Sequence, residues 1–290
     1  MTWQPERVSV IVPVRDGGTL LLEQLAALSR QTYAGKWEVI VADNGSRDGS
    51  ADNARQWADR LPSLRVVDAA DRPGAAHARN VGARNARGDV LVFCDADDVV
   101  SPTWLAALVA RLDDADLVAG AIETDLLNDP LMRRWRPFDV GAVPISHGWL
   151  PYALSANVAF RAATFAALKG FREDYRVGED VEICWRAQLA GYRFDYSPDA
   201  VVHYRFRAGL RPLLRQYVAY GTIGPRLFHD FREGGMPASG FRTAVGPWVR
   251  LVAKLPIALL STTARGDVLR RMAFRLGRIR GSLQTRVLYL

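Results

Sequence analysis

Residues 88–98 read GDVLVFCDADD, an apolar run that ends in three aspartates, Asp95, Asp97 and Asp98. Residues 90–94 of this run predict a buried strand. Residues i and i+2 of an extended segment point the same way, so Asp95 and Asp97 present their carboxylates together. Two like charges at that distance destabilise each other unless a cation lies between them, and hard oxygen ligands suit Mg²⁺ or Mn²⁺. We therefore expect a divalent metal here; the alternative is a turn in which Asp98 has a capping role.

The segments before this strand alternate between apolar runs and helical patterns. The apolar runs are RVSVIVPV, WEVIVAD and LRVVDA, and the helical patterns are LLLEQLAALSRQ, GSADNARQWADRL and GAAHARNVGARNAR. Continuous Val/Ile runs flanked by helices indicate strands that are covered on both faces. The pattern predicts an α/β fold with a doubly wound, mostly parallel sheet, in which ligands bind at the carboxyl ends of the strands.

The second half of the chain changes character twice. A helix (SPTWLAALVARL) and a strand (ADLVAGAIET) precede residues 125–153, which carry few periodic apolar residues and predict a long irregular loop. Aromatic residues in this loop argue against disorder, so we expect a lid. From residue 208 to residue 290 the pattern is helical, basic and amphipathic, which predicts a helical C-terminal extension.

Charge is distributed unevenly along the chain. Residues 1–202 hold 22 Lys+Arg against 28 Asp+Glu, whereas residues 203–290 hold 16 against 3. This asymmetry indicates an anionic partner for the C-terminal part. Apolar residues interleaved with Arg at helical spacing predict an interfacial helix pair on an anionic membrane surface. Packing of these helices on the preceding domain, with a solvated Arg face, is the alternative. Aromatic interleaving is too sparse to indicate nucleic-acid binding.

Two cysteines, Cys94 and Cys184, are too few for a disulfide framework. Both lie in apolar or helical patterns, so packed, reduced thiols in a cytoplasmic protein are expected. The first residues show no signal-peptide pattern, and no apolar window is long enough to span a membrane. We expect a cytoplasmic protein that binds peripherally to the cytoplasmic face of the membrane.

Further polar residues lie where the predicted sheet would gather them. Asp43 ends the second strand, and such an Asp is well placed to bind a nucleoside. Arg79 offers planar donors suited to phosphate, or else forms a surface ion pair. Glu179 and Asp180 begin a helix, where a carboxylate stays ionised and can accept a proton, although N-terminal capping is the plain alternative. His203 ends a strand and is either a metal ligand or structural.

Taken together, the segments VSVIVPVRDG, VIVADNGSRDGS, GAAHARNVGARNARGDVLVFCDADD, SANVAFRAATFAALKGFRED and GEDVEICWRAQLAGYRF resemble family 2 glycosyltransferases of the GT-A fold. The resemblance covers about residues 7–205. It implies a catalytic domain over residues 1–207, with a nucleotide-binding half (1–98) and an acceptor-binding half (99–207), followed by the extension at 208–290. The sequence departs from the family pattern at one motif, because it has PVRDG where many members have Pro-x-Tyr-Asn.

The resemblance also implies roles for single residues. Asp180 would be the general base, supported by Glu179, and Asp95, Asp97 and His203 would hold the metal. The nucleotide sugar would contact a set drawn from four segments: Pro13, Arg15, Asp43, Asp48, Arg79, Asp95 and Ala96. The acceptor side would include Trp149, Asn157 and Trp185.

The implied activity is inverting, hexosyl-type transfer from a UDP-, dTDP- or GDP-sugar to a hydroxyl of a glycan, lipid-linked or small-molecule acceptor. A divalent metal would assist a single displacement. Two rival functions are a non-catalytic nucleotide-sugar-binding module and a nucleotidyltransferase of related fold. The second rival would require a catalytic Lys or Arg in a Gly-rich loop after the first strand, where VPVRDGG has no lysine.

Overall fold

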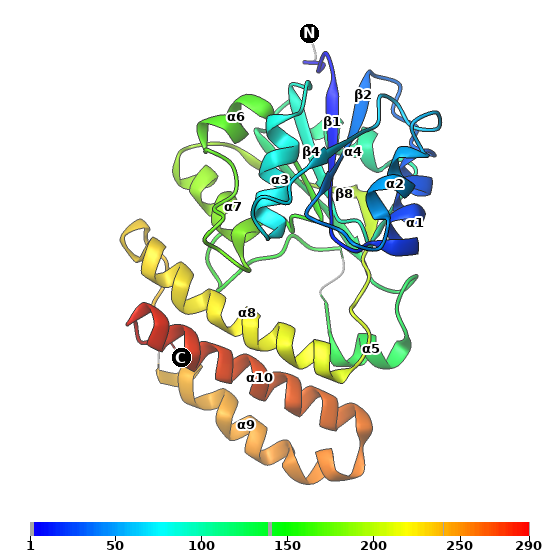
Figure 1. Ribbon diagram of the computed structural model, residues 1–290. Coiled ribbons are helices and arrows are strands. Elements are labelled where there is room, and N and C mark those ends of the chain that lie inside the picture. Colours follow the sequence, from blue (N-terminus) through cyan, green and yellow to red (C-terminus); the bar gives the residue numbers. More distant parts are fainter. Residues whose placement is uncertain (1–2, 139–140, 240, 290) are drawn as a thin grey trace. The chain divides into compact units, whose positions relative to one another are not determined.

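The computed structural model describes residues 3–138, 141–239 and 241–289, and the side chains of all of these except residues 241–245 (Figure 1). The chain forms two compact units. Unit 1 comprises the described residues within Met1–Leu126, Asp139–Pro144 and Pro151–Arg205. Unit 2 comprises the described residues within Leu127–Phe138, Ile145–Leu150 and Phe206–Leu290. The division into functional halves and an extension stays a prediction.

Unit 1 is built on one mixed sheet of eight strands in the order β3-β2-β1-β4-β7-β6-β8-β5. The strands are β1 (Val8–Val14), β2 (Trp37–Asp43), β3 (Arg65–Asp68), β4 (Val90–Cys94), β5 (Val99–Val100), β6 (Leu117–Glu123), β7 (Asn157–Arg161) and β8 (Phe194–His203). Strands β3, β2, β1 and β4 are parallel, β7 runs antiparallel between β4 and β6, and β6 is parallel to β8. The predicted α/β fold is confirmed.

Helices flank this sheet (Figure 1). They are α1 (Gly18–Leu28), α2 (Ser50–Arg55), α3 (Ala75–Arg84), α4 (Trp104–Arg111), α6 (Ala162–Ala167) and α7 (Glu179–Leu189). The central strands are buried because helices cover them, and every residue of β4 is buried. Small residues let α3 approach the sheet: a Cβ added at Gly82 would lie 2.5 Å from the Ile11 side chain. The apolar runs of the sequence are therefore strands covered on both faces.

An aromatic cluster joins β4 and β7 to α6 and the loop after it. The ring of Phe93 lies 5.3 Å from Phe165 and 5.2 Å from Phe171, and Phe160 packs edge-on at 6.2 Å. Such offset and edge-on pairs stabilise a core beyond their area of burial. The cluster fixes the strand that carries the three aspartates. The two cysteines are buried and free, as predicted.

Unit 2 contains the long helices α8 (Leu210–Phe231), α9 (Phe241–Leu260) and α10 (Thr262–Thr285), the short 3₁₀ helix η1 (Arg232–Gly234) and the helix α5 (Pro130–Trp135). In Figure 1, α10 lies between α8 and α9. Gly221 and Gly277 make the close crossing of α8 and α10 possible, because a Cβ on Gly277 would collide with the Val218 carbonyl. No helix among the described residues is long and apolar enough to cross a bilayer.

The loop predicted over residues 125–153 is partly wrong. It contains α5, which begins after Asp129, whose side chain accepts a hydrogen bond from the Leu131 backbone. This helix lies against α10, and the Trp135 indole donates to the Thr262 carbonyl at 3.3 Å. Such a contact with a distant segment leaves no periodic signal in the sequence. Residues 139 and 140 of the stretch lie outside the described residues.

Candidate active site

The carboxyl end of β4 carries three carboxylates. One side-chain oxygen each of Asp95, Asp97 and Asp98 lies within 4.8 Å of the others. The loop is held by Gln24 of α1, whose amide donates to the Asp95 carbonyl at 3.1 Å and accepts from the Val100 backbone at 3.1 Å. Because these two bonds of Gln24 go to backbone groups, they fix the loop without occupying the carboxylates of the cluster.

Asp98 is the buried member of this cluster, with 1% of its surface exposed. Its Oδ1 accepts a hydrogen bond from the Arg205 backbone at 2.7 Å, while Oδ2 is buried without a hydrogen-bond partner among the described residues. Burial raises the pKa of Asp98 well above its usual range, and the charges of Asp95 and Asp97 raise it further. An orphaned buried oxygen beside two more carboxylates is a position that a cation would satisfy.

These residues fit a hard divalent cation. Three carboxylates supply the oxygen ligands that Mg²⁺ and Mn²⁺ prefer, and they leave positions for oxygens of a substrate. The sequence predicted Asp95 and Asp97 as ligands, and the structure adds Asp98 to the cluster. The signal for Asp98 was present in the doubled aspartate after the strand.

Arg79 links this cluster to the second acidic group of the site. Its two terminal nitrogens donate to Asp95 at 2.6 Å and to Glu179 at 3.0 Å. Burial alone would lower the pKa of Arg79, but the carboxylates of Asp95 and Glu179 raise it. The guanidinium also lies over the Phe171 ring, 5.9 Å from its centroid. The buried Arg79 cation thus holds the end of β4 and the start of α7 together. Its contact with a diphosphate stays a prediction.

Asp180 lies at the start of α7, directly after Gly178 and Glu179. Gly178 adopts φ +83°, which a residue with a side chain rarely adopts. The Asp180 carboxylate accepts hydrogen bonds from the backbone of Val181, at 2.8 Å, and of Ser155. Burial raises the pKa of Asp180 to about 7, with the Glu179 charge contributing. A carboxylate of that pKa is suited to accept a proton near neutral pH.

His203 ends β8 and is held by Glu123. Its Nδ1 lies 2.6 Å from the Glu123 carboxylate, and the ring is partly exposed. This bond orients the ring and leaves Nε2 as the nitrogen that a metal would take, a common arrangement around metal-bound histidines. His203 does not belong to the carboxylate cluster found among the described residues, so its role as a ligand stays a prediction.

The predicted nucleotide-binding residues lie around the carboxyl ends of β1, β2 and β4. Pro13 pairs with Ala42 across β1 and β2, and Asp43 accepts a hydrogen bond from the Ser46 backbone at 3.1 Å. Two other members of the set differ in exposure: Arg15 is exposed and Ala96 is buried. These residues lie at the carboxyl-end edge of the sheet, where ligands bind in doubly wound folds.

Asp48 has a structural task of its own. Its carboxylate accepts hydrogen bonds from the backbone of Gly18, at 2.8 Å, and from the Ser50 hydroxyl, at 2.6 Å. The Ser50 hydroxyl lowers the pKa of Asp48. Asp48 therefore ties the start of α1 to the turn before α2, and its contact with a nucleotide stays a prediction.

Two of the three predicted acceptor-side residues are fully buried. Asn157 is fully buried, accepts from the Trp104 indole at 2.8 Å and donates to the carbonyls of Ala121 and Ala200. Trp185 is fully buried in α7. Burial corrects the prediction for Asn157 and Trp185, since an acceptor cannot reach either side chain. Trp149 belongs to unit 2, where its ring lies 6.2 Å from Phe231, and its role stays a prediction.

Sequence reasoning missed Gln24, Glu123 and Arg205. Arg205 donates to the Asp97 carbonyl at 2.8 Å through Nε, in addition to its backbone bond to Asp98. It pairs with Glu23 at 2.5 Å as well. An arginine two residues after a strand-ending histidine was the available signal, but only the pairing of β5 with β8 brings it to the cluster.

The fold and these groups define a GT-A-type protein with an acidic cluster at the carboxyl end of β4. The chain belongs to glycosyl transferase family 2, whose family model matches residues 9–185. It is 30% identical over 198 residues to the glycosyltransferase AglE of Haloferax volcanii, covering 67% of this chain and 65% of that protein. It is 28% identical over 271 residues to the pre-mycofactocin glycosyltransferase of Mycobacterium tuberculosis, covering 88% of this chain and 56% of that protein. The chain thus spans less than two thirds of these relatives.

Two solved structures share the fold. The mannosyltransferase PcManGT of Pyrobaculum calidifontis, in complex with GDP-Man and Mn²⁺, matches with a TM-score of 0.67 and 23% identity, covering 98% of this chain and 88% of that one. TarS 1-349 of S. aureus, in complex with UDP-GlcNAc, matches with a TM-score of 0.58 and 16% identity, covering 98% and 93%. Both likenesses concern the fold.

Proposed function

We propose that this protein is an inverting glycosyltransferase that moves a hexosyl group from a nucleotide sugar to an acceptor hydroxyl in a single displacement. The observation that carries the proposal is the Arg79 bridge between Asp95 and Glu179. It joins a carboxylate cluster suited to a divalent metal with the start of α7, where the next residue, Asp180, has a pKa of about 7. A non-catalytic binding module would need the metal-binding cluster but would not need the base.

Asp180 performs the proton transfer in this mechanism. It accepts the proton of the acceptor hydroxyl as the oxygen attacks the anomeric carbon, and the nucleoside diphosphate leaves from the opposite face. The backbone N–H groups of Val181 and Ser155 hold this carboxylate at the start of α7. Burial, with the Glu179 charge contributing, keeps its pKa near neutrality. Because one displacement occurs, the anomeric configuration inverts.

Asp95, Asp97 and Asp98 would hold Mg²⁺ or Mn²⁺, which when bound offsets the negative charge of the leaving diphosphate. His203 would complete this ligand set through Nε2. The donor is a UDP-, dTDP- or GDP-sugar; GDP-Man and UDP-GlcNAc are bound in the two similar structures. The acceptor is a glycan or a lipid-linked hydroxyl in polysaccharide biosynthesis, reached at an anionic membrane surface on the cytoplasmic side.

The test is a panel of sugar nucleotides screened for protection against thermal unfolding, with Mn²⁺ and with EDTA. A ligand that binds only the folded state raises the apparent stability, so a true donor is detected without an acceptor. We expect protection by one nucleotide class, and only with metal. Turnover should release a nucleoside diphosphate; release of pyrophosphate would instead show a nucleotidyltransferase.

A further inference from the structure

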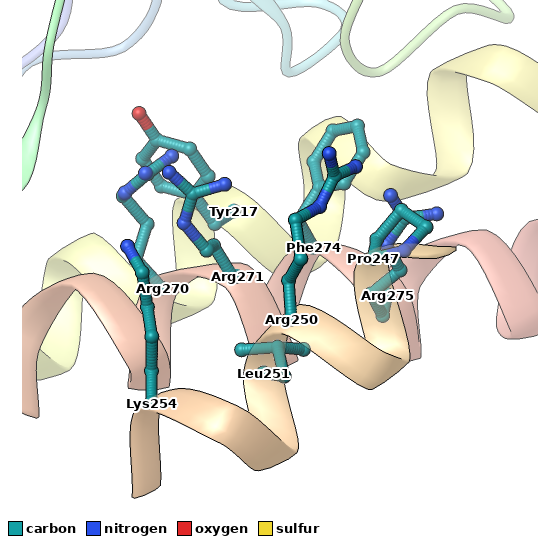
Figure 2. A pocket seen from close by; sticks show the side chains of 9 residues that line it. All are labelled: Tyr217, Pro247, Arg250, Leu251, Lys254, Arg270, Arg271, Phe274 and Arg275. Carbon is teal, nitrogen blue, oxygen red and sulfur yellow. The ribbon is translucent and has the colours of Figure 1, made fainter. Parts of the chain in front are cut away.

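Unit 2 contains a basic pocket formed by α8, α9 and α10 (Figure 2). It is a cavity of about 550 Å³. Its lining consists of five cationic and four largely apolar side chains: Arg250, Lys254, Arg270, Arg271, Arg275, Tyr217, Pro247, Leu251 and Phe274. Five cations around one cavity repel each other unless enough anions offset them, so the pocket has the composition of an anion site.

One acid, Asp267, contributes to the organisation of the pocket. It pairs with Lys254 of α9 at 3.1 Å, and with Arg270 and Arg271 of its own helix at 2.7 and 2.9 Å. Burial raises the pKa of Asp267, but these hydrogen bonds outweigh burial and lower the pKa to about 2. Asp267 is therefore ionised at any physiological pH and fixes three cations.

Arg250 and Arg275 complete the cationic lining of the pocket. Burial and then the neighbouring positive charges, including Arg250, lower the pKa of Arg275. Figure 2 shows both side chains among those that line the pocket. Three cations share the single charge of Asp267, so the lining as a whole keeps a positive excess that an anionic ligand would offset.

The ring of Tyr217 on α8 forms part of the wall of the pocket. The Arg270 guanidinium lies over the Tyr217 ring, 5.0 Å from its centroid. This contact pins Arg270, which is largely buried, between α8 and α10. Planar guanidinium groups held in place are suited to phosphate oxygens, because each can donate two parallel hydrogen bonds.

Exposed apolar side chains accompany the pocket on the same helices. Among the described residues, the exposed large hydrophobic side chains other than Leu126, Ile145 and Leu189 all lie between residues 248 and 288. On α9 they include one face at helical spacing: Trp248, Val252, Leu255 and Leu259. On α10 they form a second face: Met272, Leu276, Ile279 and Leu283. A soluble anion would leave these faces in water.

We propose that the basic pocket binds the phosphate of an anionic phospholipid headgroup while the exposed faces of α9 and α10 enter the membrane surface. Amphipathic helices with cations beside apolar side chains bind membranes in this way. The proposal deepens the membrane attachment proposed above by naming its site. It does not depend on the transfer reaction, so a catalytically inactive protein should bind equally well.

The test is flotation of the full chain with phosphatidylcholine vesicles that contain one third phosphatidylglycerol or none, at low salt. The pocket variant is R250E/R275E. The matched control is R211E/R215E, which makes the same charge change at exposed positions of α8 outside the pocket. Circular dichroism should be unchanged in both. Since one cation near an anionic surface accounts for about fivefold in affinity, the pocket variant should lose at least about tenfold, and the control much less.

A third variant, V252S/L259S, tests the apolar faces and should also float less than wild type. Sodium phosphate should displace wild type from the vesicles at least as well as sodium chloride of the same ionic strength, because free phosphate competes for the pocket. The lipid proposal is wrong if wild type stays unbound, if the pocket and control variants lose equally, or if V252S/L259S floats as well as wild type. Wild type that binds sodium phosphate in calorimetry but does not float with the vesicles would assign the pocket to a soluble anion instead.

Discussion

Replacing Asp180 with Asn should remove transfer and at the same time stabilise the protein at neutral pH. The pKa of Asp180 is about 7 in the folded chain, against about 3.8 for an ordinary aspartate. The folded state therefore holds a proton between about pH 4 and pH 7 that the unfolded chain has released. Stability falls as pH rises through this window, and the loss is complete above about pH 7.

The magnitude follows from the shift. A difference of about 3 pKa units at about 1.4 kcal/mol per unit corresponds to about 4 kcal/mol of unfolding free energy by about pH 8. The asparagine side chain carries no charge at any pH, so the variant escapes this loss. We expect D180N to equal wild type near pH 4 and to exceed it by about 1–4 kcal/mol at about pH 8, with donor binding retained.

The assay is urea unfolding at several pH values in EDTA, beside a transfer assay with metal. Asp199, an exposed aspartate of β8, provides the control D199N, which should follow wild type at every pH. Wild-type transfer should rise through about pH 7 as Asp180 loses its proton. Equal pH dependence of stability in wild type and D180N, or transfer by D180N near the wild-type rate, would refute the assignment of the base.

Three further changes test the metal cluster, the core and unit 2. D97A should abolish turnover and the Mn²⁺-dependent part of donor binding with the fold intact, and calorimetry with Mn²⁺ alone should show weakened binding; full activity in EDTA-treated wild type would contradict a metal requirement. N157A should destabilise unit 1 by about 2–4 kcal/mol in urea unfolding, because the Trp104 indole and two buried carbonyls lose their partner; a loss within about 0.5 kcal/mol would show that the site relaxes. G277A should separate α8 from α10 through its collision with the Val218 carbonyl and lower the melting temperature of unit 2; an unchanged melting temperature would show that the crossing adapts.

Much of the site could be predicted because its residues end predictable elements. Apolar runs 90–94 and 37–42 predict strands, and the carboxyl ends of parallel strands share one edge, so Asp95 and Asp43 had to lie on that edge. The acidic pair at 179–180 follows a glycine and begins a helical pattern, which placed it at a helix start. In each case the signal is local: hydrophobic period, turn residue and charge all lie within a few positions.

The sequence by itself determined the strands, the acidic motif and the basic character of the last helices, because these depend on neighbouring residues. Only the tertiary structure decided which side chains are buried in the core or paired with other residues, and are therefore not accessible to a ligand. It buried Asn157 and Trp185, brought Arg205 to Asp98 by pairing β5 with β8, and placed Arg79 between two carboxylates. It also gathered cations of α9 and α10 around one cavity. Burial and long-range pairing set which charges are neutralised. Both depend on contacts between residues that are distant in the chain, and local sequence patterns do not reveal such contacts.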